Sequence, residues 1–255
     1  MRTRPAGDFD YEAGGQHYAT VRRADPRIAA AIRRAIGGAS SLVNVGAGAG
    51  SYEPADLEVT PVEPSGMMRS QRPAHLAPAV DAVAGDLPFA DDSFDAGLAS
   101  FTVHQWPDLA AGLHELRRVT RGPVVVLTAA PEPLAEFWLT EYAPELMVAE
   151  SGRMPPIDVI GGLLGGRVEV EPVPVPSDCT DGFVEAFFGR PEALLDERVR
   201  RSQSAWGFIG PEAEAASVAT LRAVLDDGSW DRRHGHLRTV AAYAGSLRLI
   251  TATPD

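Results

Sequence analysis

The stretch Leu42-Val-Asn-Val-Gly-Ala-Gly-Ala-Gly50 decides the fold of this chain. Its apolar first part is typical of a short buried strand, and the glycines from Gly46 onward predict a tight turn. Because glycine has no Cβ, a ligand can lie against the N–H groups of such a turn and the N-terminus of a following helix. We therefore expect a strand, a ligand-binding turn and a helix, in that order.

Upstream of this turn, Asp25-Pro26 is a strong helix start, because an N-cap acceptor is followed by proline at the first helical position. The apolar residues Ile28, Ala31, Ile32 and Ile36 then fall on one helical face. Gly37-Gly38 ends the segment. A helix that packs against the strand is expected here.

Downstream, short apolar runs alternate with helical segments. The expected strands are Leu57–Val62, Val80–Val83, Phe94–Phe101 and Pro123–Leu127, with helices opening at Ser65 and Asp108. This alternation predicts a mostly parallel sheet with both faces covered. Two late strands, Arg167–Val170 and Leu247–Thr251, are separated by a long helical excursion and are expected to pair antiparallel at one edge.

Composition excludes several classes of function. The net charge of −12 argues against a nucleic-acid partner, since phosphate binding needs clustered positive charge. All 23 basic residues are arginine, so no lysine can form a Schiff base or bind phosphate in a P-loop. The single cysteine, Cys179, cannot form an internal disulfide, and no apolar run is long enough to span a bilayer. We expect a cytoplasmic protein.

Glu63 lies 17 residues after Gly46, at the end of the next expected strand. A carboxylate there can accept hydrogen bonds from both hydroxyls of a ribose. The block from Gly85 to Asp95 follows, with Leu87-Pro-Phe89 and Ser93-Phe-Asp95 inside it. A helix ending in Glu115-Leu-Arg-Arg-Val119 comes next.

This order of blocks resembles the class I S-adenosylmethionine (SAM)-dependent methyltransferases, in particular the methyltransferase type 11 group. The resemblance covers residues 15–130, about half the chain. It implies an α/β fold with a doubly wound, mostly parallel, seven-stranded Rossmann-like sheet and helical lid insertions. It also implies SAM as the cofactor. The residues that it places at the cofactor are Tyr18, Arg22, Asn44, Gly46, Ala47, Gly48, Glu63, Pro64, Met68, Gly85, Asp86, Leu87, Ser100 and Phe101.

Two positions depart from the family pattern. The first motif commonly begins with an acidic residue, where this chain has Asn44, whose amide can orient the turn or reach the ligand amine through water. The adenine-side block usually has an acid where Val83 stands, and Asp86 is the nearest substitute. The adenine can alternatively be bound by backbone groups of Ala84 and Gly85.

A dinucleotide-binding domain is the direct rival. Gly46-x-Gly48-x-x-Ser51 nearly fits its fingerprint, and Glu63 nearly fits its acidic residue. That alternative gives no role to Leu87-Pro-Phe89 or Ser93-Phe-Asp95, so the sequence favours SAM.

The reacting end is expected after the fourth strand, because ligands in open α/β sheets bind beyond the carboxyl ends of the strands. His104 is the candidate general base, since its unperturbed pKa near ~6.5 suits proton removal. The alternative is a histidine that only packs against the cofactor or fixes the loop. Trp106 lines the pocket or enters the core.

Aromatic and basic residues elsewhere leave two interpretations each. Tyr18 and Arg22 share a helical face, and Arg22 either pairs with the methionine carboxylate of SAM or is an exposed surface residue. Phe137, Trp138 and Tyr142 form either an apolar substrate wall or part of the core. His234 and His236 have no cluster of ligands around them, and no metal site is expected.

We expect one domain over residues 1–255. It comprises a cap segment (1–24), a cofactor-binding core (15–130), a lid insertion (131–165) and C-terminal strands with a helical insertion (166–255). The predicted reaction moves the SAM methyl group to an O, N or C nucleophile of a small-molecule acceptor, with no nucleic-acid or membrane partner. The alternative is a protein of this fold that binds SAM or S-adenosylhomocysteine without methylating. The oligomeric state stays open.

Overall fold

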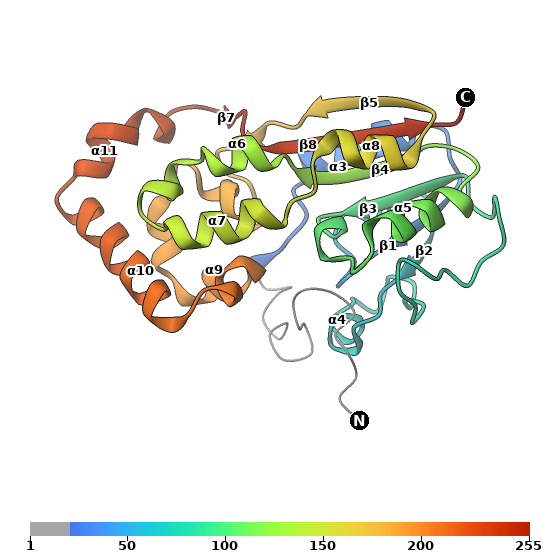
Figure 1. The fold of residues 1–255 in the computed structure, drawn as a ribbon, viewed down its shortest axis with the longest axis horizontal. Helices are drawn as coiled ribbons and strands as arrows, with labels where there is room; N and C mark the ends of the chain where they lie inside the picture. Colours follow the sequence, from blue (N-terminus) through green and yellow to red (C-terminus); the bar gives the residue numbers. More distant parts are fainter. Residues whose placement is uncertain (1–20) are drawn as a thin grey trace.

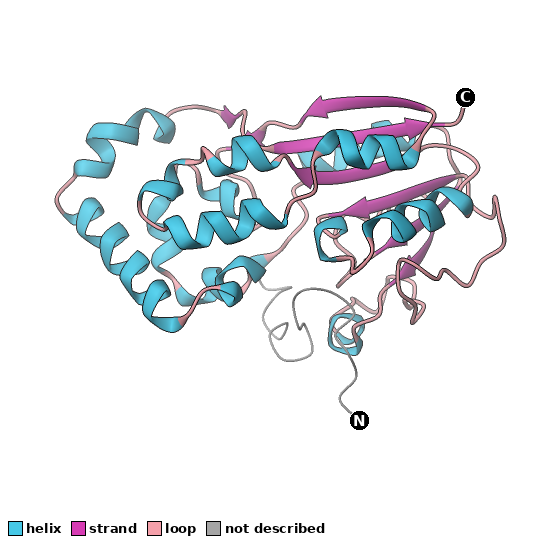
Figure 2. Cartoon of the chain, in the orientation of Figure 1, coloured by secondary structure: helices cyan, strands magenta, loops and turns pink. Residues whose placement is uncertain are grey.

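The computed structural model of the chain describes residues 21–255. A twisted sheet occupies one part of the molecule, and a group of helices that includes α7, α10 and α11 forms the other (Figure 1). Figure 2 shows the same division by secondary structure. Most of the expected cap segment, with Tyr18, lies outside the described residues.

The first described helix forms as its sequence predicts. α3 (Pro26–Ile36) begins at Asp25, whose carboxylate accepts the N–H of Arg27 at 2.9 Å. Its buried face consists of Ile28, Ala31, Ile32 and Ile36. Gly37 ends it with φ +68°, a backbone angle that favours glycine.

The central sheet has six strands in the order β2-β1-β3-β4-β8-β5. Their bounds are β1 (Ser41–Val45), β2 (Glu58–Val62), β3 (Ala96–Ser100), β4 (Val124–Ala129), β5 (Arg167–Pro172) and β8 (Leu247–Thr253). The first four in this order are parallel, and β8 is antiparallel to both β4 and β5. The expected antiparallel pair at the edge is therefore confirmed.

The prediction of a seventh strand in this sheet, at Val80–Val83, is wrong. Val80–Val83 contributes only one parallel bridge, Val80 to Val62, with the N–H of Glu63 donating to the Val80 carbonyl at 3.0 Å. Pro78 has no N–H to extend this pairing on one side. On the other side the chain turns at once, since the N–H of Asp86 bonds back to the Val83 carbonyl at 3.1 Å.

The expected helix after the glycine turn is also absent. Residues 46–57, all described, form turns and connect β1 directly to its parallel neighbour β2. The glycines reach Gly50, and Pro54 follows four residues later, which disfavours helical backbone at Glu53. Too little sequence remains between them for a helix.

Both faces of the sheet are covered. α3 lies on one face, with Ile32, Leu42 and Leu127 in a shared core. α5 (Leu109–Arg118) and α8 (Ile157–Leu164) lie on the other, with Leu116, Val126 and Ile160 in a second core. The chain is thus doubly wound, as expected.

The remaining elements build the helical part, a second small sheet and short connections. They are α4 (Gly66–Ser70), η2 (Val103–Gln105), α6 (Pro131–Ala135), η3 (Trp138–Glu141), α7 (Pro144–Arg153), β6 (Val175–Pro176), η4 (Val184–Phe187), η5 (Pro191–Leu195), α9 (Glu197–Arg201), η6 (Ser204–Phe208), α10 (Pro211–Asp226), α11 (Ser229–His234), η7 (Gly235–Arg238) and β7 (Ala242–Tyr243). Strands β6 and β7 pair antiparallel. No helix of residues 21–255 is long and apolar enough to cross a membrane.

The aromatic residues of the expected lid belong to the core. Phe137, Trp138 and Tyr142 are buried, and the indole N–H of Trp138 donates to the Phe188 carbonyl at 3.0 Å. Trp138 also packs edge-on against Trp230, with ring centroids 5.3 Å apart. The core interpretation of these residues is therefore confirmed.

Candidate functional site

The glycine turn lies tightly against the loop that follows β3. Gly46 has φ +72°, and a Cβ on it would come within 2.0 Å of the Thr102 hydroxyl oxygen. The N–H groups of Gly46 and Ala47 both donate to the Val62 carbonyl at 2.9 Å. A side chain at position 46 would separate the two loops, so their contact requires glycine.

Glu63 joins this turn to the end of β2. Its carboxylate accepts the N–H of Gly48 and the N–H of Ser65, each at 2.8 Å. The side chain is buried, and desolvation raises the pKa of the carboxyl group. A buried carboxylate beside the turn can accept hydrogen bonds from ribose hydroxyls, as its place in the sequence predicted.

The neighbouring cofactor candidates lie around this carboxylate. Ser65 caps α4 by accepting the N–H of Met68 at 3.2 Å, and Met68 is buried. The Met68 methyl carbon lies 3.3 Å from where a Cβ on Gly48 would stand. Pro64, between Glu63 and the N-cap residue Ser65 in the sequence, is partly buried. The geometry brings this group of predicted residues together.

Asn44 belongs to a buried polar network that the sequence did not reveal. Its amide donates to the Glu53 carboxylate at 3.1 Å, while its Oδ1 is buried and has no partner among the described residues. Arg72 holds the same carboxylate in a two-pronged pair at 3.0 and 2.8 Å. The two side chains of this pair are only 4% and 2% exposed. Asn44, which stands where the family commonly has an acidic residue, is therefore hydrogen-bonded to the nearby carboxylate of Glu53.

The Leu87-Pro-Phe89 turn is fixed by the helix that carries the Glu115 and Arg118 signature. The Glu115 carboxylate accepts the N–H of Leu87 at 2.9 Å, and Arg118 donates to the carbonyls of Leu87 and Phe89 at 3.2 and 2.9 Å. Leu87 is buried, whereas Gly85 and Asp86 are exposed. The Leu87-Pro-Phe89 turn and the end of helix α5 are thus held together as one structural unit.

Phe101, directly after Ser100 at the end of β3, stands between the turn and the helical part. Its φ is +52°, a strained value for a non-glycine residue. The ring contacts Phe183, with centroids 5.1 Å apart, and lies under the Arg22 guanidinium at 5.1 Å. Strain of this kind often accompanies a functional site.

Arg22 is part of the site wall. Its guanidinium pairs with Asp181 at 2.6 Å, and the two side chains are 11% and 2% exposed. Asp181 also accepts the Tyr52 hydroxyl at 2.9 Å. The exposed-surface interpretation of Arg22 is therefore wrong.

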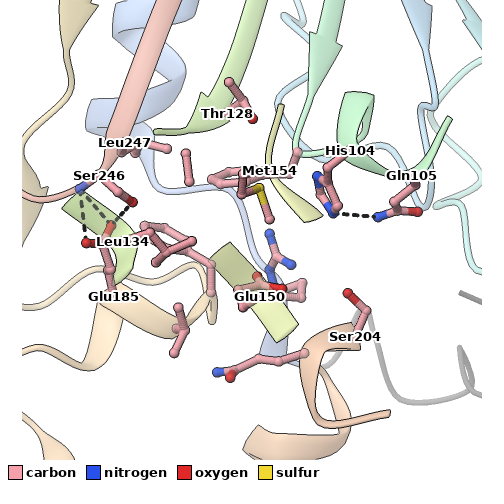
Figure 3. A pocket seen from close by; sticks show the side chains of 16 residues that line it. His104, Gln105, Thr128, Leu134, Glu150, Met154, Glu185, Ser204, Ser246 and Leu247 are labelled. Atoms are coloured by element: carbon pink, nitrogen blue, oxygen red, sulfur yellow. Dashed lines mark hydrogen bonds between the residues drawn. The ribbon is translucent and has the colours of Figure 1, made fainter. Parts of the chain in front are cut away.

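A pocket of about 590 Å³, including its mouth, opens beyond the carboxyl ends of β3 and β4. The strands contribute Thr128, Ala129 and Leu247, helix α7 contributes Glu150, and Met154 directly follows that helix (Figure 3). The rest of the wall comprises Arg22, Phe101, His104, Gln105, Leu134, Phe183, Val184, Glu185, Gln203, Ser204 and Ser246. The arrangement mixes apolar walls with several polar groups, as small-molecule sites do.

His104 lies on the pocket wall beside Gln105 (Figure 3). Its Nε2 is 3.3 Å from the Gln105 amide nitrogen, and its Nδ1 is buried with no partner among the described residues. Desolvation, and then the positive charges of Arg153 and Arg22, lower the pKa of His104 from its ordinary 6.5 to about 3. The imidazole is therefore neutral at physiological pH.

Trp106 and the pair His234 and His236 both lie outside the pocket wall. Trp106 packs over Gly112 and donates its indole N–H to the Thr102 hydroxyl at 3.2 Å, so it supports the loop rather than the pocket. The His234 ring packs in tilted and edge-on contacts with Trp138, Tyr142 and Trp230. Within residues 21–255 no group of three metal-binding side chains occurs.

Comparison with known proteins agrees with this geometry. The sequence profile described as "Methyltransferase domain" matches residues 43–126. A crystal structure of a putative methyltransferase from an antibiotic biosynthesis pathway of Anabaena variabilis is 30% identical, with a TM-score of 0.84. That match covers 91% of this chain and 99% of the other.

Two further relatives match either a shorter stretch or at lower identity. The demethylmenaquinone methyltransferase of Mycobacterium marinum is 44% identical over 71 residues, which make up 26% of this chain and 31% of that protein. A Haemonchus contortus phosphoethanolamine N-methyltransferase, solved with SAM, is 16% identical with a TM-score of 0.56. This match covers 96% of this chain and 57% of that one, and it shows the fold alone.

Fold, motifs and comparisons together define a Rossmann-like methyltransferase. The chain belongs to the class I SAM-dependent methyltransferases, and its cofactor is S-adenosylmethionine.

Proposed function

We propose that this enzyme transfers the SAM methyl group to an O, N or C nucleophile of a small molecule bound in the pocket. One observation carries the proposal. The glycine turn touches Thr102, and two residues further along the same loop His104 lies on the pocket wall. The cofactor turn and the pocket are therefore linked by three consecutive residues, which supports a methyl donor at the pocket mouth.

The proposed chemistry is an in-line displacement at the sulfonium methyl group. The acceptor nucleophile forms a bond to the methyl carbon as the carbon–sulfur bond breaks, and S-adenosylhomocysteine leaves. Alignment supplies most of the rate enhancement, because the sulfonium is already a strong electrophile. For an acceptor that loses a proton, neutral His104 would accept a hydrogen bond from that group, although a pKa of about 3 makes it a weaker base than an ordinary histidine.

For His104 to accept a proton or a hydrogen bond from the acceptor, one of its two ring nitrogens must be unprotonated and without another donor. With the Gln105 amide nitrogen donating to Nε2, the proton of the neutral ring lies on Nδ1. If the amide is turned so that its oxygen accepts from Nε2–H, Nδ1 becomes the free base. We propose that the second arrangement is the reactive one, which requires the bound acceptor to reach the buried Nδ1.

Two observations support a small-molecule acceptor. The pocket is walled by this chain's own elements from β3 to β8, and the net charge of −12 disfavours nucleic acid. The relatives named for demethylmenaquinone also have a small-molecule acceptor in their name.

The test is turnover of methyl-labelled SAM with a panel of phenols, amines and activated carbon acids, alongside tRNA and a protein mixture. We expect label transfer to one of the small-molecule classes. Transfer only to tRNA or protein would refute the small-molecule proposal. Binding of SAM without transfer to any acceptor would favour a non-methylating member of the family.

A further inference from the structure

Glu185 is a buried carboxylate in the pocket wall that the methyl-transfer chemistry does not use. It lies on η4 and is 2% exposed. Its oxygens accept the Ser246 N–H at 3.0 and 3.1 Å and the Ser246 hydroxyl at 2.6 Å. Figure 3 shows the pair at one end of the pocket. Every one of these hydrogen bonds is donated to the carboxylate, which suits its ionised form.

This carboxylate forms no direct ion pair among the described residues, although the positive charge of Arg248 acts on it. Within the described chain, no arginine or histidine lies at ion-pair distance from Glu185, and its hydrogen-bond partner Ser246 is neutral. The guanidinium of Arg248 instead donates to the carbonyls of Gly245 and Leu247, at 2.8 and 3.0 Å. A buried charge without a counter-ion is unfavourable. Accordingly, desolvation raises the pKa of Glu185.

A second polar group in the same pocket also has an unused hydrogen-bonding position. The Thr128 side chain is 1% exposed, lines the pocket, and has no hydrogen-bond partner for its hydroxyl among the described residues. Buried hydroxyls are normally paired. Thr128 and Glu185 therefore each offer a bond that a ligand would complete.

The sheet order sets the distance between these groups and the methyl-transfer end. His104 follows β3, Thr128 is on β4, and Ser246 directly precedes β8, and these are three adjacent strands. Neighbouring strands lie about 4.8 Å apart, so the end of β3 that leads to His104 and the start of β8 that follows Ser246 are about 10 Å apart. Leu134, Phe183 and Val184 supply apolar wall in the same pocket.

We propose that the methyl acceptor carries a protonated amine, which Glu185 binds at the end of the pocket opposite His104. The ammonium pairs with the carboxylate, the apolar middle of the acceptor packs on Phe183, and the nucleophile lies at His104. The amine bound by Glu185 holds a proton and is not the methylated atom. This inference rests on the proposed function and narrows its acceptor class.

The test uses tyramine and tyrosol, which share a phenol and differ by an ammonium against a hydroxyl at the other end. Calorimetry measures both dissociation constants on the full chain saturated with S-adenosylhomocysteine. The expected result is a preference for tyramine of at least about tenfold, since a buried charge-assisted bond adds about 1.4 kcal/mol or more. In Glu185→Gln this preference should vanish, while it should persist in Glu197→Gln on the exposed side of α9.

Other results overturn the inference. Equal affinity for the two probes, or a preference that survives in Glu185→Gln, would show that Glu185 does not bind the cation. Binding of neither probe to a protein that binds S-adenosylhomocysteine would reject this acceptor class and leave the proposed function standing. Loss of S-adenosylhomocysteine binding in the wild type would instead reject the proposed function. Ser246→Ala, which keeps the carboxylate, provides a second variant and should retain the preference for tyramine.

Discussion

At the scale of single residues, Glu63 fixes the turn by accepting the Gly48 N–H, and we propose that it also binds the ribose. Glu63→Ala should weaken SAM binding by about 1–3 kcal/mol, because buried hydrogen bonds to the cofactor are lost. Calorimetry with Glu58→Ala as control, an exposed residue at the start of the strand that precedes Glu63, measures this difference. Equal affinities in the two variants would remove Glu63 from the cofactor site.

His104 makes a prediction about pH. Its pKa is about 3 in the folded chain and about 6.5 when unfolded, so the unfolded chain binds more protons between these values. The free energy of unfolding is therefore fully retained above about pH 6.5 and falls as the pH drops toward 3. In His104→Gln part of this dependence should disappear. Urea unfolding at about pH 5 and 7.5 measures it, and an unchanged slope would show that the imidazole is not desolvated.

The same residue predicts a kinetic profile. Because His104 stays neutral, turnover should be flat between about pH 6 and 8 unless the acceptor itself titrates. His104→Gln should lower kcat more than it weakens SAM binding. Equal losses in both quantities would assign the residue to packing.

Residue types at the cofactor end could be predicted from sequence because the signals are local. Glu63 follows its strand directly, and the turn glycines follow theirs. Arg22 was different, since its partner Asp181 is 159 positions away. No local pattern distinguishes an arginine held by such a distant acid from one at the surface.

At the scale of elements, the Glu53–Arg72 pair lies where a helix was expected. It connects the helix-free segment 46–57 to the chain after α4 and supports Asn44. A dinucleotide needs a helix N-terminus for its pyrophosphate, whereas SAM has no phosphate. The turns between β1 and β2 thus strengthen the choice of cofactor.

Arg72→Ala should lower the free energy of unfolding by about 3–5 kcal/mol, because it leaves the Glu53 carboxylate buried without its counter-ion. Arg33→Ala, which breaks the more exposed pair with Asp56, should cost about 1 kcal/mol or less. Chemical denaturation of both variants makes the comparison. Similar losses would mean that the Glu53–Arg72 pair does not hold the turn.

The mostly parallel sheet and its antiparallel edge were predictable, because they follow from the alternation of strands and helices and from the late pair of strands. The seventh strand and the helix after the turn were not, since both depend on a few residues. Pro78 and the bend at Val83 reduce the expected strand Val80–Val83 to a single bridge. Gly50 and Pro54 prevent the expected helix after the glycine turn. A prediction from the average strand or helix propensity of a whole segment does not detect an interruption by one or two residues.

At the scale of the whole molecule, the pocket is assembled from segments that are distant in sequence. Arg22, Thr128, Glu185 and Ser246 meet only after the sheet and the helical part have packed together. The second half of the chain therefore gave little information on the acceptor by sequence alone. The folded arrangement brings these residues into one pocket, where we propose that the acceptor binds.

The most direct test of the account is calorimetric binding of S-adenosylhomocysteine to the wild type, Gly46→Ala and Gly38→Ala. The turn at Gly46 cannot accept a Cβ beside Thr102, whereas a Cβ on Gly38 meets nothing within 4 Å. We predict one binding site per chain in the wild type and in Gly38→Ala, and strongly reduced binding in Gly46→Ala. No binding to the wild type, or unchanged binding in Gly46→Ala, would contradict a cofactor site at this turn.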